Sequence, residues 1–123
     1  MDEINTITRE VIGCAFEVGT ELGIGYAEKV YENALVFEMR SRGLNLEQQV
    51  PLKVRYKEVV VGEFIADIVV EGCVLIELKA QNAILDAHVA QCVNYLKTTG
   101  FPIALILNFG TPRVQTKRVV GNS

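Results

Sequence analysis

Three charged residues, Asp67, Glu77 and Lys79, lie inside stretches of sequence that otherwise consist of apolar side chains. An ionised group buried in a core costs several kcal/mol unless it is paired or bound to a metal ion. Glu77 and Lys79 are two residues apart, so in a strand they point to the same face. These three residues therefore need an electrostatic or a chemical partner.

The position of Asp67 relative to Glu77 depends on the register of the hairpin that contains them. A three-residue turn places Asp67 opposite Glu77 and Ala66 opposite Leu78, so that one face is apolar and the other carries both carboxylates. A two-residue turn would separate the two acids. Gly72 can supply the left-handed residue that a three-residue turn uses, and we predict this register.

Two carboxylates beside a lysine have two interpretations. In the first, Lys79 neutralises Glu77 within a partly exposed ion-pair network. In the second, the two carboxylates and the backbone carbonyl of Leu78 bind a hard cation such as Mg²⁺ or Mn²⁺, which prefers oxygen ligands. Lys79 would then position or activate a water molecule beside a phosphate. These residues alone do not decide between the two.

Two predicted helices each carry a row of residues at spacing i, i+3, i+7, which places each row on one helix face. The rows are Glu28, Tyr31 and Leu35, and His88, Gln91 and Tyr95. Glu28 is a third acid within reach of a neighbouring sheet. Such a row can equally be the hydrogen-bonded edge of a buried stripe, and a single histidine is more often structural than catalytic.

The elements that must position these residues are read from hydrophobic periodicity. The first helix is capped by Asn5 or Thr6 and broken by the glycine-rich stretch 19–25, and the second buries Val30, Ala34 and Phe37. We predict helices through 4–18, 27–42 and 85–99, and strands through 46–57, 59–70, 73–80, 103–108 and 114–120. The order ααβββαββ predicts an α/β (α+β) fold in which helices flank a mixed central sheet.

Composition narrows the class of protein. The 123 residues are 50% apolar and 22% charged, which is typical of a soluble globular protein, and we expect one domain over residues 1–123. The net charge of −3 argues against a protein that coats nucleic acid by bulk charge, but it allows a local basic groove.

The sequence also predicts a cytoplasmic location. Cys14, Cys73 and Cys92 are widely spaced within apolar stretches and are interpreted as reduced core residues. The N-terminus lacks the features of a signal peptide. No apolar run approaches the roughly 20 residues of a membrane helix, so we expect no membrane partner.

With these motifs identified, the chain resembles the PD-(D/E)xK nuclease superfamily. Asp67 is followed ten residues later by Glu77-Leu78-Lys79, in a helix-strand-strand-strand-helix-strand order. More closely, the run GYAEKVY at 25–31 is similar to the signature of the GxxExxY family of small prokaryotic proteins. That similarity continues through QVPL at 49–52, Ala66-Asp67, IELKA at 76–80 and LNF at 107–109.

The resemblance implies a restriction-endonuclease-like core and Mg²⁺-dependent (or Mn²⁺-dependent) cleavage of phosphodiester bonds. It implies that Asp67 and Glu77 are metal ligands and that Lys79 orients the attacking water and stabilises charge on the phosphate. Glu28 matches the helix-borne acid of the RecB-type branch, where it helps to hold the metal. The proline of the superfamily's name is Ala66 here.

The same branch has a QxxxY helix beside its active site, which Gln91 and Tyr95 match and which implies contacts with the substrate backbone. Tyr31 and His88 are further candidate substrate contacts. Basic residues that could contact phosphates are Lys53, Arg55 and Lys57 on the first strand, and Arg113, Lys117 and Arg118 near the C-terminus. Their other interpretation is a solvated strand face.

We therefore expect a nuclease whose partner is nucleic acid, with DNA the favoured substrate, and a homodimer is one option for a chain this small. One alternative is a catalytically silent module that keeps the fold and binds nucleic acid or a protein. Another is a magnesium enzyme acting on a small phosphorylated compound, which would need a closed pocket.

Overall fold

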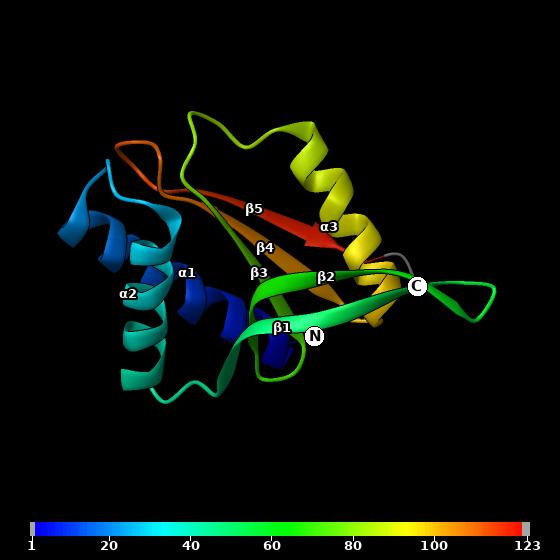
Figure 1. Ribbon diagram of the computed structural model, residues 1–123. Coiled ribbons are helices and arrows are strands. Elements are labelled where there is room, and N and C mark those ends of the chain that lie inside the picture. Colours follow the sequence, from blue (N-terminus) through cyan, green and yellow to red (C-terminus); the bar gives the residue numbers. More distant parts are fainter. Residues whose placement is uncertain (1, 122–123) are drawn as a thin grey trace.

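A computed structural model describes residues 2–121, so residue 1 and residues 122–123 of the predicted domain lie outside the described part. The predicted order ααβββαββ is confirmed (Figure 1). The elements are α1 (Asp2–Leu22), α2 (Glu28–Ser41), β1 (Leu46–Tyr56), β2 (Val59–Val70), β3 (Val74–Lys79), α3 (Asp86–Thr99), β4 (Ile103–Asn108) and β5 (Gln115–Val120).

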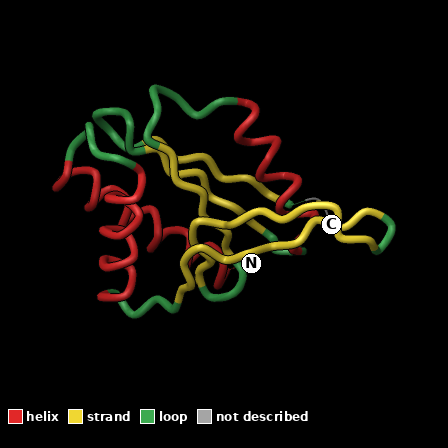
Figure 2. Tube along the Cα trace, in the orientation of Figure 1, coloured by secondary structure: helices red, strands yellow, loops and turns green. Residues whose placement is uncertain are grey.

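The five strands form one mixed sheet in the order β1-β2-β3-β4-β5 (Figure 2). β3 and β4 are parallel, because α3 carries the chain back to the starting end of the sheet. The other three pairs are antiparallel. β3 and β4 lie in the centre, and nearly all of their residues are buried. The mixed sheet predicted from the sequence is confirmed.

The helices cover the two faces of this sheet. One core joins α1 and α2 to the sheet through Val11, Leu35 and Leu105, among others. The second core joins α3 to the other face through Cys92 and Leu96. Figure 1 shows α1 and α2 together on one side and α3 on the other. Among residues 2–121, no helix has the length and the apolar character needed to span a membrane.

The first helix is longer than the sequence predicts at both ends. It begins at Asp2, and the Thr6 hydroxyl donates to the Asp2 carbonyl within the helix instead of capping its start. Gly19 does not break the helix either. A Cβ atom at this position would lie 2.3 Å from Cγ2 of Val114, so the glycine permits close approach of the β4–β5 connection.

The predicted buried stripe of α2 is also corrected. Val30 and Phe37 are exposed, and the helix instead buries Tyr31, Leu35 and Met39. Tyr31 can be buried because its hydroxyl group forms hydrogen bonds inside the protein.

The β2–β3 turn confirms the predicted three-residue loop, with Ile68 opposite Ile76 and Gly72 at φ +66°. The prediction that this pairing continues to Ala66 and Leu78 is wrong. The ladder ends at Ile68, and Ala66 packs in the α3-side core while Leu78 packs against α1 and α2. The regular alternation of faces along β2 is therefore interrupted at Asp67.

The three cysteines are free. Cys14 and Cys92 are buried, as the sequence predicts, whereas Cys73 in the β2–β3 turn is partly exposed. Burial raises the pKa of the Cys92 thiol to about 12, and the nearby Glu77 carboxyl adds to this effect. Cys92 is therefore an unreactive core residue.

Candidate active site

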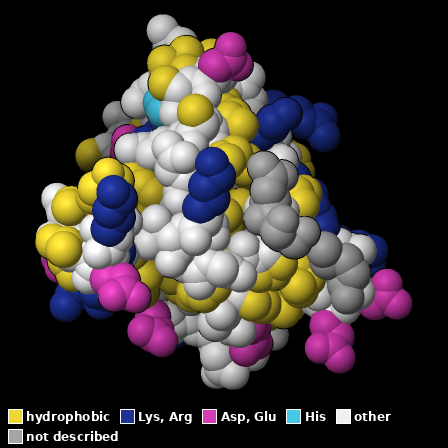
Figure 3. Space-filling model, turned by 90° about the vertical axis from the view of Figure 1, so that its right-hand side faces the viewer, with side chains coloured by type: hydrophobic (Ala, Val, Ile, Leu, Met, Phe, Trp, Pro, Cys, Tyr) yellow, Lys and Arg dark blue, Asp and Glu magenta, His cyan; other side chains and the backbone are white. Residues whose placement is uncertain are grey.

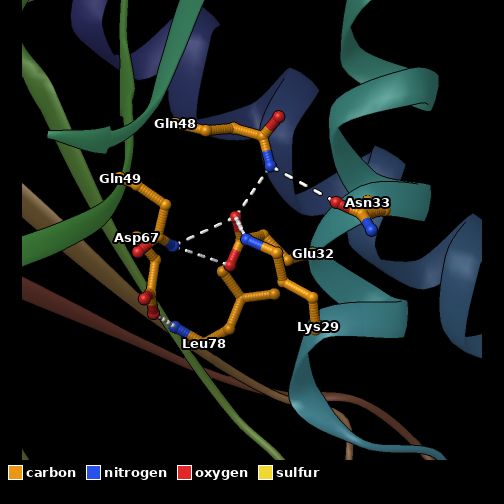
Figure 4. Close-up of polar contacts among 7 residues, drawn as sticks. All are labelled: Lys29, Glu32, Asn33, Gln48, Gln49, Asp67 and Leu78. Atoms are coloured by element: carbon orange, nitrogen blue, oxygen red, sulfur yellow. Dashed lines mark hydrogen bonds and ion pairs between the residues drawn. The ribbon is translucent and has the colours of Figure 1, made fainter.

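Asp67 lies where β2 and β3 separate. Its Oδ2 atom accepts a hydrogen bond of 2.8 Å from the backbone N–H of Leu78 (Figure 4). The carboxylate thus takes the place of a strand carbonyl on β2. This bond holds Asp67 against β3 at the residue between Glu77 and Lys79.

Glu77 is a buried acid with an unsatisfied oxygen. Its residue is 8% exposed, and Oε1 has no hydrogen-bond partner among the described residues. Burial, and next the negative charge of Asp67, raise its pKa from 4.5 to about 9, although Lys79 acts in the opposite direction. A buried carboxyl in this state requires a proton or a cation.

Lys79 and Glu28 complete a charged group around the two carboxyls. Lys79 is half-buried at the end of β3. Glu28 begins α2, and partial burial, together with the charge of Asp67, raises its pKa, while Lys79 and His88 lower it. Glu28 is therefore close enough to Asp67 and Lys79 for their charges to act on it.

Two residues of the α3 row, His88 and Tyr95, lie within electrostatic range of the same group. Partial burial and the charge of Glu77 raise the pKa of Tyr95, whose ring stacks on Phe64 with centroids 3.5 Å apart. Nδ1 of His88 accepts the Leu85 N–H at 3.1 Å, which caps the helix and leaves Nε2 outside this contact. Gln91 is exposed, one turn before Tyr95.

Tyr31 has a different role from the predicted one. Its ring has no exposed surface and stacks on Phe109 at 4.8 Å between centroids. Its hydroxyl donates to the Gly23 carbonyl at 2.6 Å and accepts the Tyr26 N–H at 3.2 Å. Tyr31 therefore holds the α1–α2 loop, and the expectation that it contacts substrate is corrected.

The basic residues predicted near the C-terminus do not share one surface. The Arg118 guanidinium donates to Asn5 and Thr8 of α1, so Arg118 joins β5 to α1. Arg113 lies over the ring of Phe16, 5.5 Å from its centroid. Lys117 is exposed, and as the neighbour of Arg118 in β5 it points to the opposite face. Arg118 thus has a structural role in joining β5 to α1, and its contact with phosphate stays a prediction.

The basic residues of β1 are placed differently. Lys53 and Arg55 line a shallow hollow together with Lys97 and Thr98 at the end of α3. None of the three cations forms an ion pair within residues 2–121. Lys57, by contrast, lies over the ring of Tyr56.

Two polar residues that support the site, Glu32 and Asn108, were not predicted as site residues from the sequence. Glu32 in α2 is buried and accepts hydrogen bonds from Gln48 and Gln49 of β1. Nothing in the sequence pattern of α2 distinguishes it. Asn108 is fully buried at the end of β4, and a polar residue closing an apolar strand was a usable signal.

Asn108 fixes the chain just after Lys79. Its side chain accepts the N–H groups of Gln81 and Gly110 at 3.0 and 3.1 Å, and it donates to the Gln81 carbonyl at 2.9 Å. A further 3.0 Å bond joins it to Gln115. Together these bonds hold the end of β3, and hence Lys79, in place.

A comparison with known protein families shows the family of the chain. The family model of the PD-(D/E)XK nuclease superfamily matches residues 5–119, which is nearly the whole chain. The chain belongs to the PD-(D/E)XK nuclease superfamily. No curated protein matches the sequence. Nucleases of the superfamily generally use divalent metal ions and act on nucleic acid.

The fold is similar to that of a solved structure. The crystal structure of a protein called SSO0001 superimposes with a TM-score of 0.62 at 16% sequence identity. The match covers 77% of this chain and 50% of SSO0001, so the chain corresponds to about half of that protein. At this identity the likeness shows the fold alone.

The residues of this superfamily member fit a divalent cation in part. The unsatisfied Oε1 of Glu77 next to the Asp67 carboxylate is a donor set that suits a hard cation. Within residues 2–121, however, no three His, Cys, Asp or Glu side chains converge into a complete metal-binding cluster. Glu28 is thus an electrostatic neighbour of the pair and does not close a cage around it.

Proposed function

We propose that this chain is a metal-dependent nuclease that hydrolyses phosphodiester bonds of nucleic acid, with DNA as its substrate. The observation that carries the proposal is the buried, unsatisfied Glu77 carboxyl beside Asp67, with Lys79 on the same strand face. An apolar core would gain nothing from this arrangement, because a buried acid without a partner is costly.

The cation would be held by Asp67, Glu77 and the backbone carbonyl of Leu78. A strand directs the N–H and C=O of one residue to the same neighbour. Because the Leu78 N–H points to Asp67, its carbonyl lies on that side as well. A divalent cation there supplies charge stabilisation at the phosphate and a lower pKa for water. Mg²⁺ or Mn²⁺ suits these oxygen ligands.

The side chains around the cation would position the water and the substrate. Lys79 orients the attacking water and stabilises the negative charge that develops on the phosphate. Glu28 adds negative charge that raises the affinity for the cation. Gln91 and Tyr95, together with His88, face the substrate backbone from α3 and hold the scissile bond in line.

The substrate would extend from this site toward the hollow formed by Lys53, Arg55 and Lys97, which we call the basic hollow. Glu63 lies opposite Lys53 in the β1–β2 register, yet it forms no ion pair with Lys53 among the described residues. These cations are therefore free to neutralise phosphates. Figure 3 looks at this end of the molecule and shows Lys and Arg side chains over its upper part and centre, with most acids below.

Within the superfamily, we assign the chain to the GxxExxY family and the RecB-type branch. The run GYAEKVY at residues 25–31 and the pair Gln91 and Tyr95 support this assignment.

We also propose a cytoplasmic location, which the three free cysteines support. A homodimer is supported by the exposed apolar residues Ile24 and Tyr26 of the α1–α2 loop.

Cleavage assays test the nuclease proposal. Linear, single-stranded and branched DNA and RNA are incubated with the protein in Mg²⁺ or Mn²⁺, with a chelator as one control. Lys79→Ala should abolish cleavage, and Lys57→Ala at the β1–β2 turn, a matched lysine outside the site, should retain it. Cleavage without metal, or by Lys79→Ala at the wild-type rate, would overturn the mechanism.

A binding module without turnover is the second candidate. The incomplete metal cluster among the described residues favours it, because two side-chain carboxylates alone hold Mg²⁺ weakly. Such a module would bind DNA with the same Kd in chelator and in Mg²⁺, and it would cleave none of the substrates. A nuclease would show a metal-dependent product.

A further inference from the structure

Glu32 is a buried carboxylate, and both of its oxygens accept hydrogen bonds. The residue is 4% exposed. Its oxygens accept bonds from Gln48 at 2.7 Å, from Gln49 at 3.0 and 3.2 Å, and from the Lys29 ammonium at 3.1 Å (Figure 4). Two of these donors come from consecutive residues of β1, so Glu32 clamps one short segment of that strand to α2.

The clamped segment has an unusual backbone. Gln49 has φ +54°, a left-handed conformation that residues other than glycine rarely adopt. Its neighbours pair normally with β2, Gln48 with Ile68 and Val50 with Ala66. Gln49 lies across from Asp67. Between Leu46 and Val54 of β1, Gln49 is the one residue that does not pair with β2.

The unpaired position at Gln49 coincides with the point where β2 changes faces at Asp67. On one side of Asp67, Ala66 packs in the α3-side core; on the other side, Ile68 packs against α1 and α2. The hairpin therefore changes faces at this point, and the change frees the Asp67 carboxylate to reach the Leu78 N–H. Figure 4 shows the Gln49 side chain between Glu32 and Asp67.

We propose that Glu32 is a positioning residue which, through Gln48 and Gln49, holds the bend of β1 and thereby places the Asp67 carboxylate at the cation site. The proposal rests on the proposed nuclease function for its consequence in catalysis. Glu32 is not assigned as a ligand of the cation, because no three acids among the described residues converge into a metal-binding group.

Two substitutions weaken the clamp, and the first of them keeps the size of the buried side chain. In Glu32→Gln, one carboxylate oxygen becomes an amide NH₂ group, which cannot accept a hydrogen bond from the glutamines. Gln49→Ala, at an exposed position, removes the same contact from the other side and serves if Glu32→Gln does not fold. Glu38→Gln is the matched control, because Glu38 is an α2 glutamate that pairs with Arg42 instead.

The first measurement is Mn²⁺ affinity by isothermal titration calorimetry. We expect Glu32→Gln and Gln49→Ala each to weaken Mn²⁺ binding about tenfold, as is usual when a residue supporting a metal ligand is lost. The Kd of the double variant for Mn²⁺ should not exceed the larger of the two single-variant values, because both substitutions act through one contact. An unchanged Kd in a folded Glu32→Gln, or additive losses in the double variant, would overturn the proposal.

The second measurement does not depend on metal, so it separates this proposal from the proposed function. Amide hydrogen exchange by NMR compares the Leu78 N–H, which Asp67 holds, with the Ile76 N–H earlier in the same strand. We expect Glu32→Gln to speed exchange at Leu78 about tenfold relative to Ile76, and Glu38→Gln to change neither. Equal changes in exchange at both amides would mean that Glu32 acts only on overall stability, which would overturn the proposal for Glu32. A wild-type protein that binds no Mn²⁺ would contradict only the nuclease proposal.

Discussion

At the scale of single residues, the site combines two acids that repel each other with one lysine that offsets only part of their charge. Burial and Asp67 together raise the pKa of Glu77 to about 9, so near neutral pH the metal-free protein keeps Glu77 protonated. A cation would replace that proton. Metal binding and protonation of Glu77 are therefore linked.

Magnesium or manganese should stabilise the folded protein. At about ten times Kd, ligation of the native state alone adds about 1.4 kcal/mol and raises Tm by about 5 °C. Asp67→Asn should abolish this increase, because an amide carries no charge although its oxygen can still accept the Leu78 N–H. Thermal unfolding with and without metal measures both, and an equal increase in the variant would contradict the assigned ligand.

The metal-free protein should lose stability as the pH rises. The folded-state pKa of Glu77, about 9, lies above its ordinary value of 4.5, so between these values the native state holds a proton that the unfolded chain has lost. The contribution is complete below pH 4.5 and falls by at most about 1.4 kcal/mol per pH unit toward pH 9.

Glu77→Gln should flatten that slope, because the amide does not titrate. Urea denaturation in chelator at several pH values provides the free energy of unfolding for both proteins. A wild-type stability that rises steadily from pH 5 to pH 9, or an unchanged slope in Glu77→Gln, would contradict the assignment.

At the scale of elements, the site depends on close crossings that small residues allow. Gly19 lets α1 approach the β4–β5 connection, where a Cβ would lie 2.3 Å from Val114. Gly110 is similar, because a Cβ there would lie 2.2 Å from the Gln81 carbonyl oxygen. The second crossing keeps the end of β3 beside β4.

Gly19→Ala should destabilise the protein by about 1–3 kcal/mol, because overpacking in a closely packed contact forces the neighbours to shift. Gly13→Ala in the same helix meets only the flexible tip of Arg42, at 3.2 Å, and should be neutral or slightly stabilising. Chemical denaturation of the two variants tests this. Adding Val114→Ala to Gly19→Ala should recover part of the loss, and a failure to do so would place the strain elsewhere.

At the scale of the whole molecule, a protein of net charge −3 must bind a polyanion through a local surface. The basic hollow at the ends of β1 and α3 brings Lys53, Arg55 and Lys97 together. Arg118 on the other edge of the sheet is occupied by α1. The end of α3, instead of the C-terminal strand, is thus the expected path of the nucleic acid.

Lys53→Ala and Lys97→Ala should each weaken DNA binding and reduce the slope of log Kd against log salt by about 1, the loss of one phosphate contact. Arg118→Ala should lower stability while leaving that slope unchanged. Fluorescence anisotropy at several salt concentrations, in Ca²⁺ or chelator to prevent cleavage, measures the slopes. Equal slopes for all three variants would remove the basic hollow from the binding surface.

The sequence by itself determined the element order, the β2–β3 turn and the candidate acids, because each follows from periodicity and residue type over short distances. A charged residue in an apolar strand, such as Glu77, is visible without a structure. Long-range contacts are not visible in this way. Periodicity failed at Tyr31 and Gly19, whose environments are set by the Gly23 carbonyl and by Val114 from other segments.

The tertiary structure alone decided how the acids are held. Glu32 becomes a clamp only because α2 packs beside the left-handed residue Gln49, which lies 17 positions further along the chain. Arg118 and Lys117 are neighbours in sequence, yet the packing of α1 on one face of β5 occupies only Arg118. Burial and hydrogen-bond partners depend on which segments meet, and that is settled by the packing of the whole chain.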